Sequence, residues 1–106
     1  LSVGLDGHIA SLFPGSTALQ EKARSVVPVV SPKPPPERLT IAPHAIRSAK
    51  STFLISQGKG KGLVLSKALQ QPVDIATLPV RLVLDATLIL DTYTAEQLNN
   101  VSKKKY

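Results

Sequence analysis

The sequence of 106 residues contains no cysteine. This absence excludes disulfide bonds, catalysis by a thiol and zinc sites built on cysteine. It is compatible with a reducing compartment, so we expect a cytoplasmic protein. The length suffices for one small domain with a modest core.

Aromatic residues are scarce, with two Phe, two Tyr and no Trp. They are not interleaved with the basic residues, so the sequence predicts no surface for stacking nucleic-acid bases. The net charge is nevertheless +6, from 13 Lys and Arg against 7 Asp and Glu. Part of this excess is the lysine tail at residues 103–105, and the rest is scattered. A basic balance of this kind is compatible with an anionic metabolite as partner, and we expect no nucleic-acid partner.

Long apolar runs are also missing, and no segment is long enough to span a bilayer, so we expect no membrane partner. The two histidines, His8 and His44, stand far apart and without clustered acids. This placement does not predict a metal site, and no cofactor is expected. His44 follows Pro43 at a predicted helix start, which favours a surface histidine.

The most informative segment that is present is GLDGHIASLFPG, residues 4–15. Gly4 and Gly7 allow a sharp turn and a close approach of the backbone to a ligand. Asp6 and His8 flank Gly7, and an imidazole can take or give a proton near neutral pH. His8 is therefore a candidate general base, with Asp6 as a group that orients its ring or contacts substrate hydroxyls.

The pattern along the chain predicts an α/β fold, with a mostly parallel sheet and flanking helices. The predicted strands are residues 1–5, 26–30, 39–41, 52–56 and 87–90. Predicted helices are 43–49, 63–69, one starting at Pro79 and a final helix capped by Thr94, with Gln97 as its capping-box partner. Residues 32–36 are proline-rich and read as a stiff connector.

Glycine and lysine alternate over residues 58–62, directly after the predicted strand 52–56. A glycine-rich turn between a strand and a helix directs backbone N–H groups at one point, where the helix dipole favours an anion. The spacing is not that of a Walker A loop. We expect a phosphate site here, with Lys61 as the binding lysine and Lys59 as the alternative.

Three segments together resemble a known family. GLDGHIASLFPG, SPKPPPERLT (31–40) and FLISQGKGKGLVLSKAL (53–69) resemble, in order and at about the same spacing, segments of the 6-phosphogluconolactonases, which share a fold with the glucosamine-6-phosphate deaminases. The resemblance covers most of residues 1–92. It implies that residues 1–106 are the C-terminal portion of a single domain of Rossmann-like type, with the N-terminal half of the same protein as its partner.

The resemblance also implies an activity, the hydrolysis of 6-phosphogluconolactone to 6-phosphogluconate in the oxidative pentose phosphate pathway. In that family the histidine matching His8 activates the attacking water, and a lysine matching Lys61 binds the substrate phosphate. Gly4, Gly7 and Arg38 are further candidates for contact with this sugar-phosphate lactone. For Arg38, a structural role is an equally good prediction.

Two alternatives remain at this stage. The first is the related deaminase chemistry, in which an acidic residue follows the histidine by five positions. That position is Phe13 here, and a phenyl ring cannot transfer a proton, so the sequence favours the lactonase. The second is a truncated sugar-phosphate-binding module without activity, since the missing half would carry an arginine that also grips the phosphate.

Overall fold

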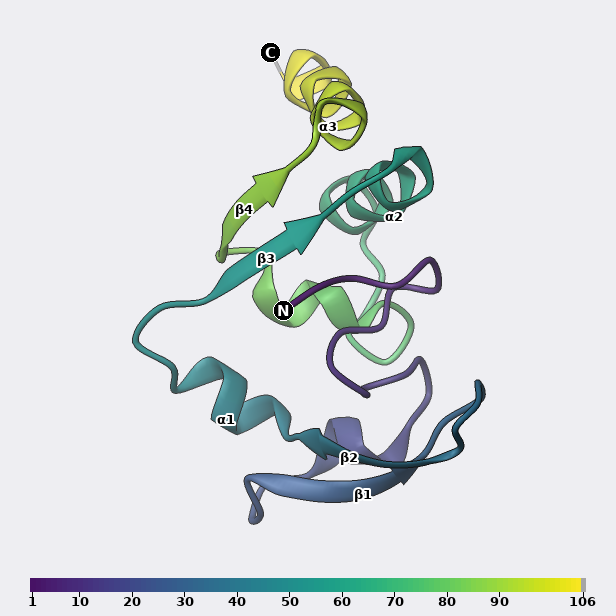
Figure 1. Ribbon diagram of the computed structural model, residues 1–106. Helices are drawn as coiled ribbons and strands as arrows, with labels where there is room; N and C mark the ends of the chain where they lie inside the picture. Colours follow the sequence, from purple (N-terminus) through teal and green to yellow (C-terminus); the bar gives the residue numbers. More distant parts are fainter. Residues whose placement is uncertain (106) are drawn as a thin grey trace.

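The computed structural model describes the backbone of residues 1–105 and the side chains of residues 1–58 and 60–98 (Figure 1). Its elements, with η for a 3-10 helix, are η1 (Thr17–Gln20), β1 (Val26–Val30), β2 (Glu37–Ile41), α1 (Pro43–Arg47), β3 (Phe53–Ser56), α2 (Lys59–Gln70), η2 (Pro79–Val83), β4 (Thr87–Leu90) and α3 (Thr92–Lys105). Strands and helices are mixed along the chain, which confirms the predicted α/β character.

The strands form two small sheets. β1 pairs with β2 antiparallel, and β3 pairs with β4 parallel. Beside β3, the N–H of Ile55 donates to the carbonyl of Leu1 at 2.8 Å, and Ser2 forms a parallel bridge with Ile55. The prediction of a mostly parallel sheet is not confirmed for the described residues. β1 and β2 are joined by a short proline-rich turn, and a connection of that length permits only antiparallel pairing.

Several elements lie where the sequence predicts them. β1 and β4 have the predicted bounds, and β2 begins two residues before the predicted 39–41. Pro43 opens α1, Pro79 opens η2, and α2 ends before Pro72. Pro28 lies in a two-stranded sheet, as expected for a residue that has no backbone N–H.

The predicted strand over residues 1–5 is wrong. This segment makes only isolated bridges, because the chain turns back on itself directly after Val3. The N–H of Gly4 donates to the carbonyl of His8 at 2.9 Å and so closes a tight turn. The polar residues of the segment therefore sit on a turn rather than at the end of a regular strand.

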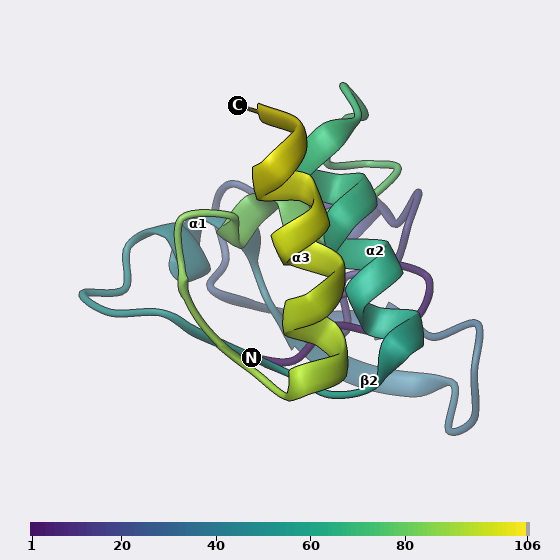
Figure 2. The ribbon, with the colours of Figure 1, turned by 90° about the horizontal axis from the view of Figure 1, so that it is seen from above.

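The predicted glycine-rich loop over residues 58–62 is also wrong. Helix α2 begins at Lys59, so most of the alternating glycines and lysines lie in its first turn. Gly62 packs against α3, where an added Cβ would come within 3.2 Å of the Thr94 Cα. Figure 2 shows α2 and α3 side by side. One glycine of a run that looks like a loop in the sequence, Gly62, serves here as a helix–helix contact.

The start of α3 differs from the prediction as well. Helix α3 begins at Thr92, and its cap is the carboxylate of Asp91, which accepts from the Thr94 N–H at 2.9 Å. The same carboxylate accepts from the Gly58 N–H at 2.8 Å. Thr94 is fully buried, and its Oγ1 donates to the Gly58 carbonyl at 3.1 Å. Asp91 therefore caps α3 and ties it to the start of α2.

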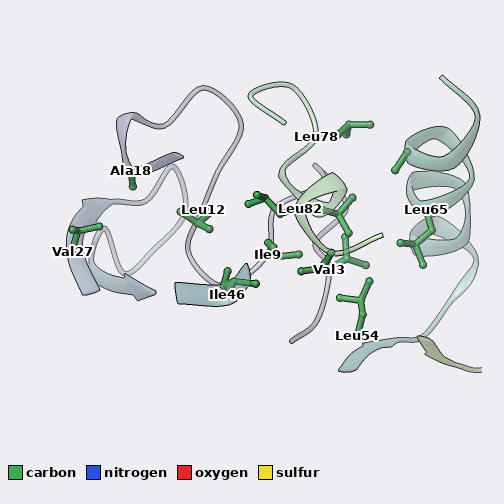
Figure 3. Packing of buried hydrophobic residues seen from close by; sticks show 13 residues of the cluster. Val3, Ile9, Leu12, Ala18, Val27, Ile46, Leu54, Leu65, Leu78 and Leu82 are labelled. Atoms are coloured by element: carbon green, nitrogen blue, oxygen red, sulfur yellow. The ribbon is translucent and has the colours of Figure 1, made fainter. Parts of the chain in front are cut away.

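The core surrounds the N-terminal turn. Val3 precedes the turn, Ile9 and Leu12 follow it, and all three side chains are almost completely buried. Figure 3 shows them packed with Leu54 of β3 and Leu82 of η2. Because buried residues flank the turn on both sides, the core fixes its position.

No helix in the described part of the chain has the length and apolar character needed to cross a membrane.

Replacement of Asp91 should uncouple the two helices. We expect Asp91→Ala to lower the midpoint of urea unfolding, because the Thr94 N–H in the first turn of α3 and the Gly58 N–H directly before α2 both lose their acceptor. Asp85→Ala, at an exposed acidic residue of the neighbouring turn, is the matched control and should leave the midpoint unchanged. Equal effects of the two variants would contradict the role of Asp91.

Candidate active site

The site is built on a turn of five residues, from Gly4 to His8. The Gly7 N–H donates to the Gly4 carbonyl at 3.0 Å, and the Gly7 carbonyl accepts from the Val80 N–H at 2.9 Å. Gly7 has a φ of +88°, which L side chains rarely adopt, and Leu78 packs against it. The turn is therefore fixed by its own hydrogen bonds and by the segment that opens η2.

Asp6 and His8 form a hydrogen-bonded pair on this turn. The Asp6 Oδ1 lies 2.5 Å from the His8 Nδ1 and also accepts from the His8 backbone N–H at 3.1 Å. One carboxylate oxygen thus fixes both the backbone and the ring of the histidine. With Nδ1 donating to the carboxylate, the neutral ring has Nε2 as its proton acceptor.

The pair is only partly shielded from solvent, with 20% of the His8 side chain and 31% of the Asp6 side chain exposed. Burial raises the pKa of the Asp6 carboxyl, but the hydrogen bonds from His8 and the charges of His8 and Lys33 outweigh it, leaving the pKa below its ordinary 3.8. The carboxylate is therefore ionised at neutral pH, and its hold on the ring is lost only as the pH falls through this lowered pKa.

Gly4 provides the space for the imidazole. A Cβ at this position would lie 2.1 Å from the His8 Cε1 and 2.2 Å from the His8 Nδ1. No residue other than glycine fits at this position without displacing the ring. Gly4 and Gly7 both shape the turn that holds His8.

Phe13 and Arg38 lie behind the imidazole. The buried Phe13 ring packs on His8 with 4.6 Å between ring centroids, and the Arg38 guanidinium carbon lies 5.6 Å from the Phe13 centroid. Arg38 also donates to the carbonyls of Pro35 at 3.0 Å and Pro34 at 3.1 Å. These contacts support the structural alternative for Arg38, because its guanidinium holds the proline-rich turn.

The start of α2 lies next to the turn. A Cβ at Gly60 would meet the Leu5 Cδ2 at 2.7 Å, so the first turn of α2 contacts the tip of the Gly4–His8 turn. In Figures 1 and 2 the purple N-terminal segment turns close to α2. Lys61 is half-buried in this first helical turn, while the side chain of Lys59 lies outside the described residues. The structure thus brings the two predicted halves of the site together through Leu5.

A large open concavity, of about 1080 Å³, lies beside Phe13 between residues 13–17 and the β1–β2 hairpin. Phe13 and Arg38 line it, whereas Asp6 and His8 do not. Asp6 and His8 therefore lie outside this concavity, although most of each side chain is shielded from solvent.

No cluster of three or more His, Asp or Glu side chains suited to a metal ion occurs among the described residues. His44 is half-buried, and its Nε2 lies 2.9 Å from the Arg24 carbonyl. This contact holds the His44 ring against the backbone, and His44 is not part of the Gly4–His8 turn.

An imidazole held by a carboxylate on a glycine turn, beside the start of a helix, is set here in a mixed α/β fold. The family model described as Glucosamine-6-phosphate isomerases/6-phosphogluconolactonase matches residues 1–92, and this chain belongs to that family. The predicted family resemblance is thereby confirmed.

Among curated relatives, the 6-phosphogluconolactonase of Rattus norvegicus is 45% identical over 71 residues, covering 66% of this chain and 28% of the rat protein. The 6-phosphogluconolactonase of Mycobacterium tuberculosis is 44% identical over 70 residues, which cover 65% of this chain and 28% of the mycobacterial protein. The solved 6-phosphogluconolactonase of Trypanosoma brucei has a TM-score of 0.76 at 31% identity, covering 92% of this chain and 40% of that one. The chain thus spans well under half the length of the relatives it matches.

Sequence reasoning missed three residues that shape the site. Leu5 joins the turn to α2, Leu78 packs on Gly7, and Asp91 ties α2 to α3. Leu5 and Leu78 carry no local signal, since their roles come from contacts distant in sequence. Asp91 does carry a local signal in the sequence, because Asp directly before a helix is a favoured N-cap.

The contact between Gly4 and the His8 ring can be tested by a double-mutant cycle. Gly4→Ala should cost about 1–3 kcal/mol of folding free energy, because the added methyl overlaps the imidazole. In a His8→Ala background the same change should cost much less, since the overlapping ring is gone. Urea unfolding of the four proteins measures the difference, and equal costs in both backgrounds would rule out the ring as the cause.

Proposed function

We propose that this chain carries the general base of a 6-phosphogluconolactonase, which hydrolyses 6-phosphogluconolactone to 6-phosphogluconate in the oxidative pentose phosphate pathway. The observation that carries the proposal is the 2.5 Å contact of the Asp6 Oδ1 with the His8 Nδ1. An ionised carboxylate on Nδ1 leaves Nε2 as the acceptor, which is the arrangement that a general base requires.

In the proposed reaction, His8 Nε2 takes a proton from a water molecule as its oxygen attacks the lactone carbonyl carbon. Asp6 stabilises the imidazolium that forms. The tetrahedral intermediate collapses with cleavage of the bond to the ring oxygen, which receives the proton from His8 and becomes a hydroxyl group. The carboxylic acid product loses its proton to solvent, and no metal or cofactor is required.

In this proposal the phosphate of the substrate binds at the start of α2. Backbone N–H groups of a helical first turn favour an anion, and a lysine adds a mobile positive charge. Lys61 is the proposed ligand, with Lys59 as the alternative. Contact between Gly60 and Leu5 supports this placement, because it sets the helix start beside the catalytic turn. Lys33 adds positive charge near Asp6 on the neighbouring proline-rich turn.

The related isomerase or deaminase chemistry is less well supported. At the position where that chemistry needs an acidic residue, Phe13 is 4% exposed and packs on His8. Its ring offers no group that exchanges a proton. A sugar-phosphate-binding module without catalysis would keep the Lys61 site, and activity measurements separate it from the enzyme.

We further propose that residues 1–106 form the C-terminal portion of a larger, Rossmann-like domain and are inactive alone. The chain matches 40% of the solved Trypanosoma brucei protein, and the Asp6–His8 pair does not line the large concavity of this chain. The walls of a substrate pocket would then come from the remaining part of the domain. On this basis the chain alone should show no lactone turnover.

The role of His8 can be measured in a chimera in which this chain replaces the matched segment of the Trypanosoma brucei protein. His8→Ala should lower kcat for 6-phosphogluconolactone by about 10²–10⁴-fold, with KM changed little, because the general base is lost but the binding groups stay. Asp6→Asn should give an intermediate loss.

His44→Ala is the matched control for that measurement, and it should leave kcat unchanged, since His44 contacts the backbone at Arg24. A folded chimera without lactonase activity, or one in which His8→Ala keeps the full rate, would contradict the proposed function. Circular dichroism and thermal unfolding establish whether each chimera is folded.

The phosphate ligand can be assigned by comparing lysines of α2 in the same chimera. Lys61→Ala should raise KM about 10–100-fold, as expected for the loss of a charged hydrogen bond, with a smaller change in kcat. Lys59→Ala should have a weaker effect, and the exposed Lys67→Ala, in the last turn, none. A larger rise for Lys59→Ala would transfer the role to that residue.

A further inference from the structure

The β1–β2 hairpin holds the segment that follows the Gly4–His8 turn. Arg38 and Thr40 are two residues apart in β2, so their side chains leave the same face of the strand. The Thr40 Oγ1 accepts from the Ser11 N–H at 3.0 Å, and the Arg38 guanidinium carbon lies 5.6 Å from the centroid of the Phe13 ring. The hairpin therefore contacts the segment at two points that are also two residues apart.

Backbone carbonyls fix the Arg38 guanidinium in this place. Its Nε donates to the Pro35 carbonyl at 3.0 Å, and its Nη2 donates to the carbonyls of Pro34 at 3.1 Å and Lys33 at 3.4 Å. These donors lie in the plane of the guanidinium, so its faces stay available for an aromatic ring. The distance to the Phe13 ring is within the range of a cation–π contact, about 6 Å. An arginine held in this way is a fixed support for a ring rather than a mobile charge.

Phe13 contacts both Arg38 and the imidazole of His8. Its ring centroid lies 4.6 Å from that of His8, with 39° between the two ring planes. Phe13 and Arg38 also border the open concavity of about 1080 Å³, which His8 does not line. This is open space into which an unrestrained phenyl ring can turn, away from the imidazole. A contact that restrains Phe13 therefore also restrains His8.

Asp6 and Phe13 restrain the imidazole in different ways. The Asp6 Oδ1 fixes one atom of the ring, Nδ1, through a hydrogen bond. Contact with the flat Phe13 ring limits the tilt of the imidazole as a whole. A general base needs both restraints, because proton transfer depends on the position and the direction of the acceptor, Nε2.

We propose that Arg38 is a positioning residue for His8, which acts through Phe13 and does not contact the substrate. The inference rests on the proposed function for the role of His8 as a base, and it adds a residue from a different sheet on which the orientation of that base depends. It also gives a role to the β1–β2 hairpin, whose antiparallel pairing the sequence did not predict: the hairpin supports the Gly4–His8 turn.

Kinetics of the chimera separate positioning from substrate binding. Arg38→Met removes the guanidinium, and it should lower kcat about tenfold with KM unchanged, because the base is displaced while the binding groups stay. Arg38→Lys keeps the charge without the planar fork and should lose less. Arg24→Met, at an arginine paired with Glu21 on the surface, is the matched control and should leave kcat unchanged.

Double variants test the path through Phe13. In a Phe13→Leu background, and in a His8→Ala background, Arg38→Met should have little further effect on kcat, since the arginine acts through both rings. The same loss in either background as in the parent chimera would overturn the inference. A KM that rises while kcat stays unchanged would also overturn it, because Arg38 would then be a substrate ligand.

Nuclear magnetic resonance of residues 1–106 reports the ring contact without turnover. Nuclear Overhauser effects between the ring protons of Phe13 and His8 should be lost in Arg38→Met and kept in Arg24→Met. Where Arg38→Met fails to fold, Arg38→Lys gives the same test, with these effects weakened rather than lost. Unchanged ring contacts in the Arg38 variants would overturn the inference.

The two proposals fail separately. A folded chimera without lactonase activity contradicts the proposed function, and the ring contacts in the chain alone still decide whether Arg38 holds the imidazole. Conversely, an active chimera that depends on His8 but keeps its full rate in Arg38→Met would uphold the proposed function and overturn this inference.

Discussion

The contact between the His8 imidazole and Gly4 is the constraint on which the site depends. The ring lies so close to the Gly4 backbone that a Cβ there would come within 2.1 Å of it. This approach sets the ring in reach of Asp6, and the carboxylate then fixes the ring through Nδ1. Phe13 closes the other side of the ring. Backbone, carboxylate and phenyl ring together leave His8 one orientation, which a base requires because proton transfer needs a fixed geometry.

The start of α2 divides its backbone donors between Asp91 and the proposed phosphate. The Asp91 carboxylate accepts from the N–H of Gly58, the N-cap residue directly before the helix. Hydrogen bonds from Thr94 and Gly58 hold the pKa of Asp91 below its ordinary value, so this internal anion persists at neutral pH. A bound phosphate would therefore use donors further into the first turn, at the side where Gly60 meets Leu5. The proposed role of Lys61, two residues inside the helix, follows from this division.

The sequence was informative where local chemistry decides the outcome and misleading where contacts distant in sequence decide it. Prolines marked the starts of α1 and η2, and β-branched residues marked β1. The pairing of Asp6 with His8 is local and was foreseeable from two residues that flank a glycine. The alternating residues 58–62 were predicted as a loop because glycine disfavours helices, but close packing against Thr94 makes a glycine useful at Gly62. The prediction of a mostly parallel sheet is not confirmed, because β3 and β4 pair parallel but β1 and β2 form an antiparallel hairpin.

The distribution of buried and exposed apolar residues connects the site to the rest of the domain. Val3, Ile9 and Leu12 anchor the turn from Gly4 to His8 in this chain's own core, so the described residues position the imidazole by themselves. Leu54 of β3 belongs to that core, whereas Phe53, Ile55 and Ile89 are exposed on the other face of the same sheet. The described residues thus fix the His8 imidazole and the start of α2 independently of the exposed face of the sheet.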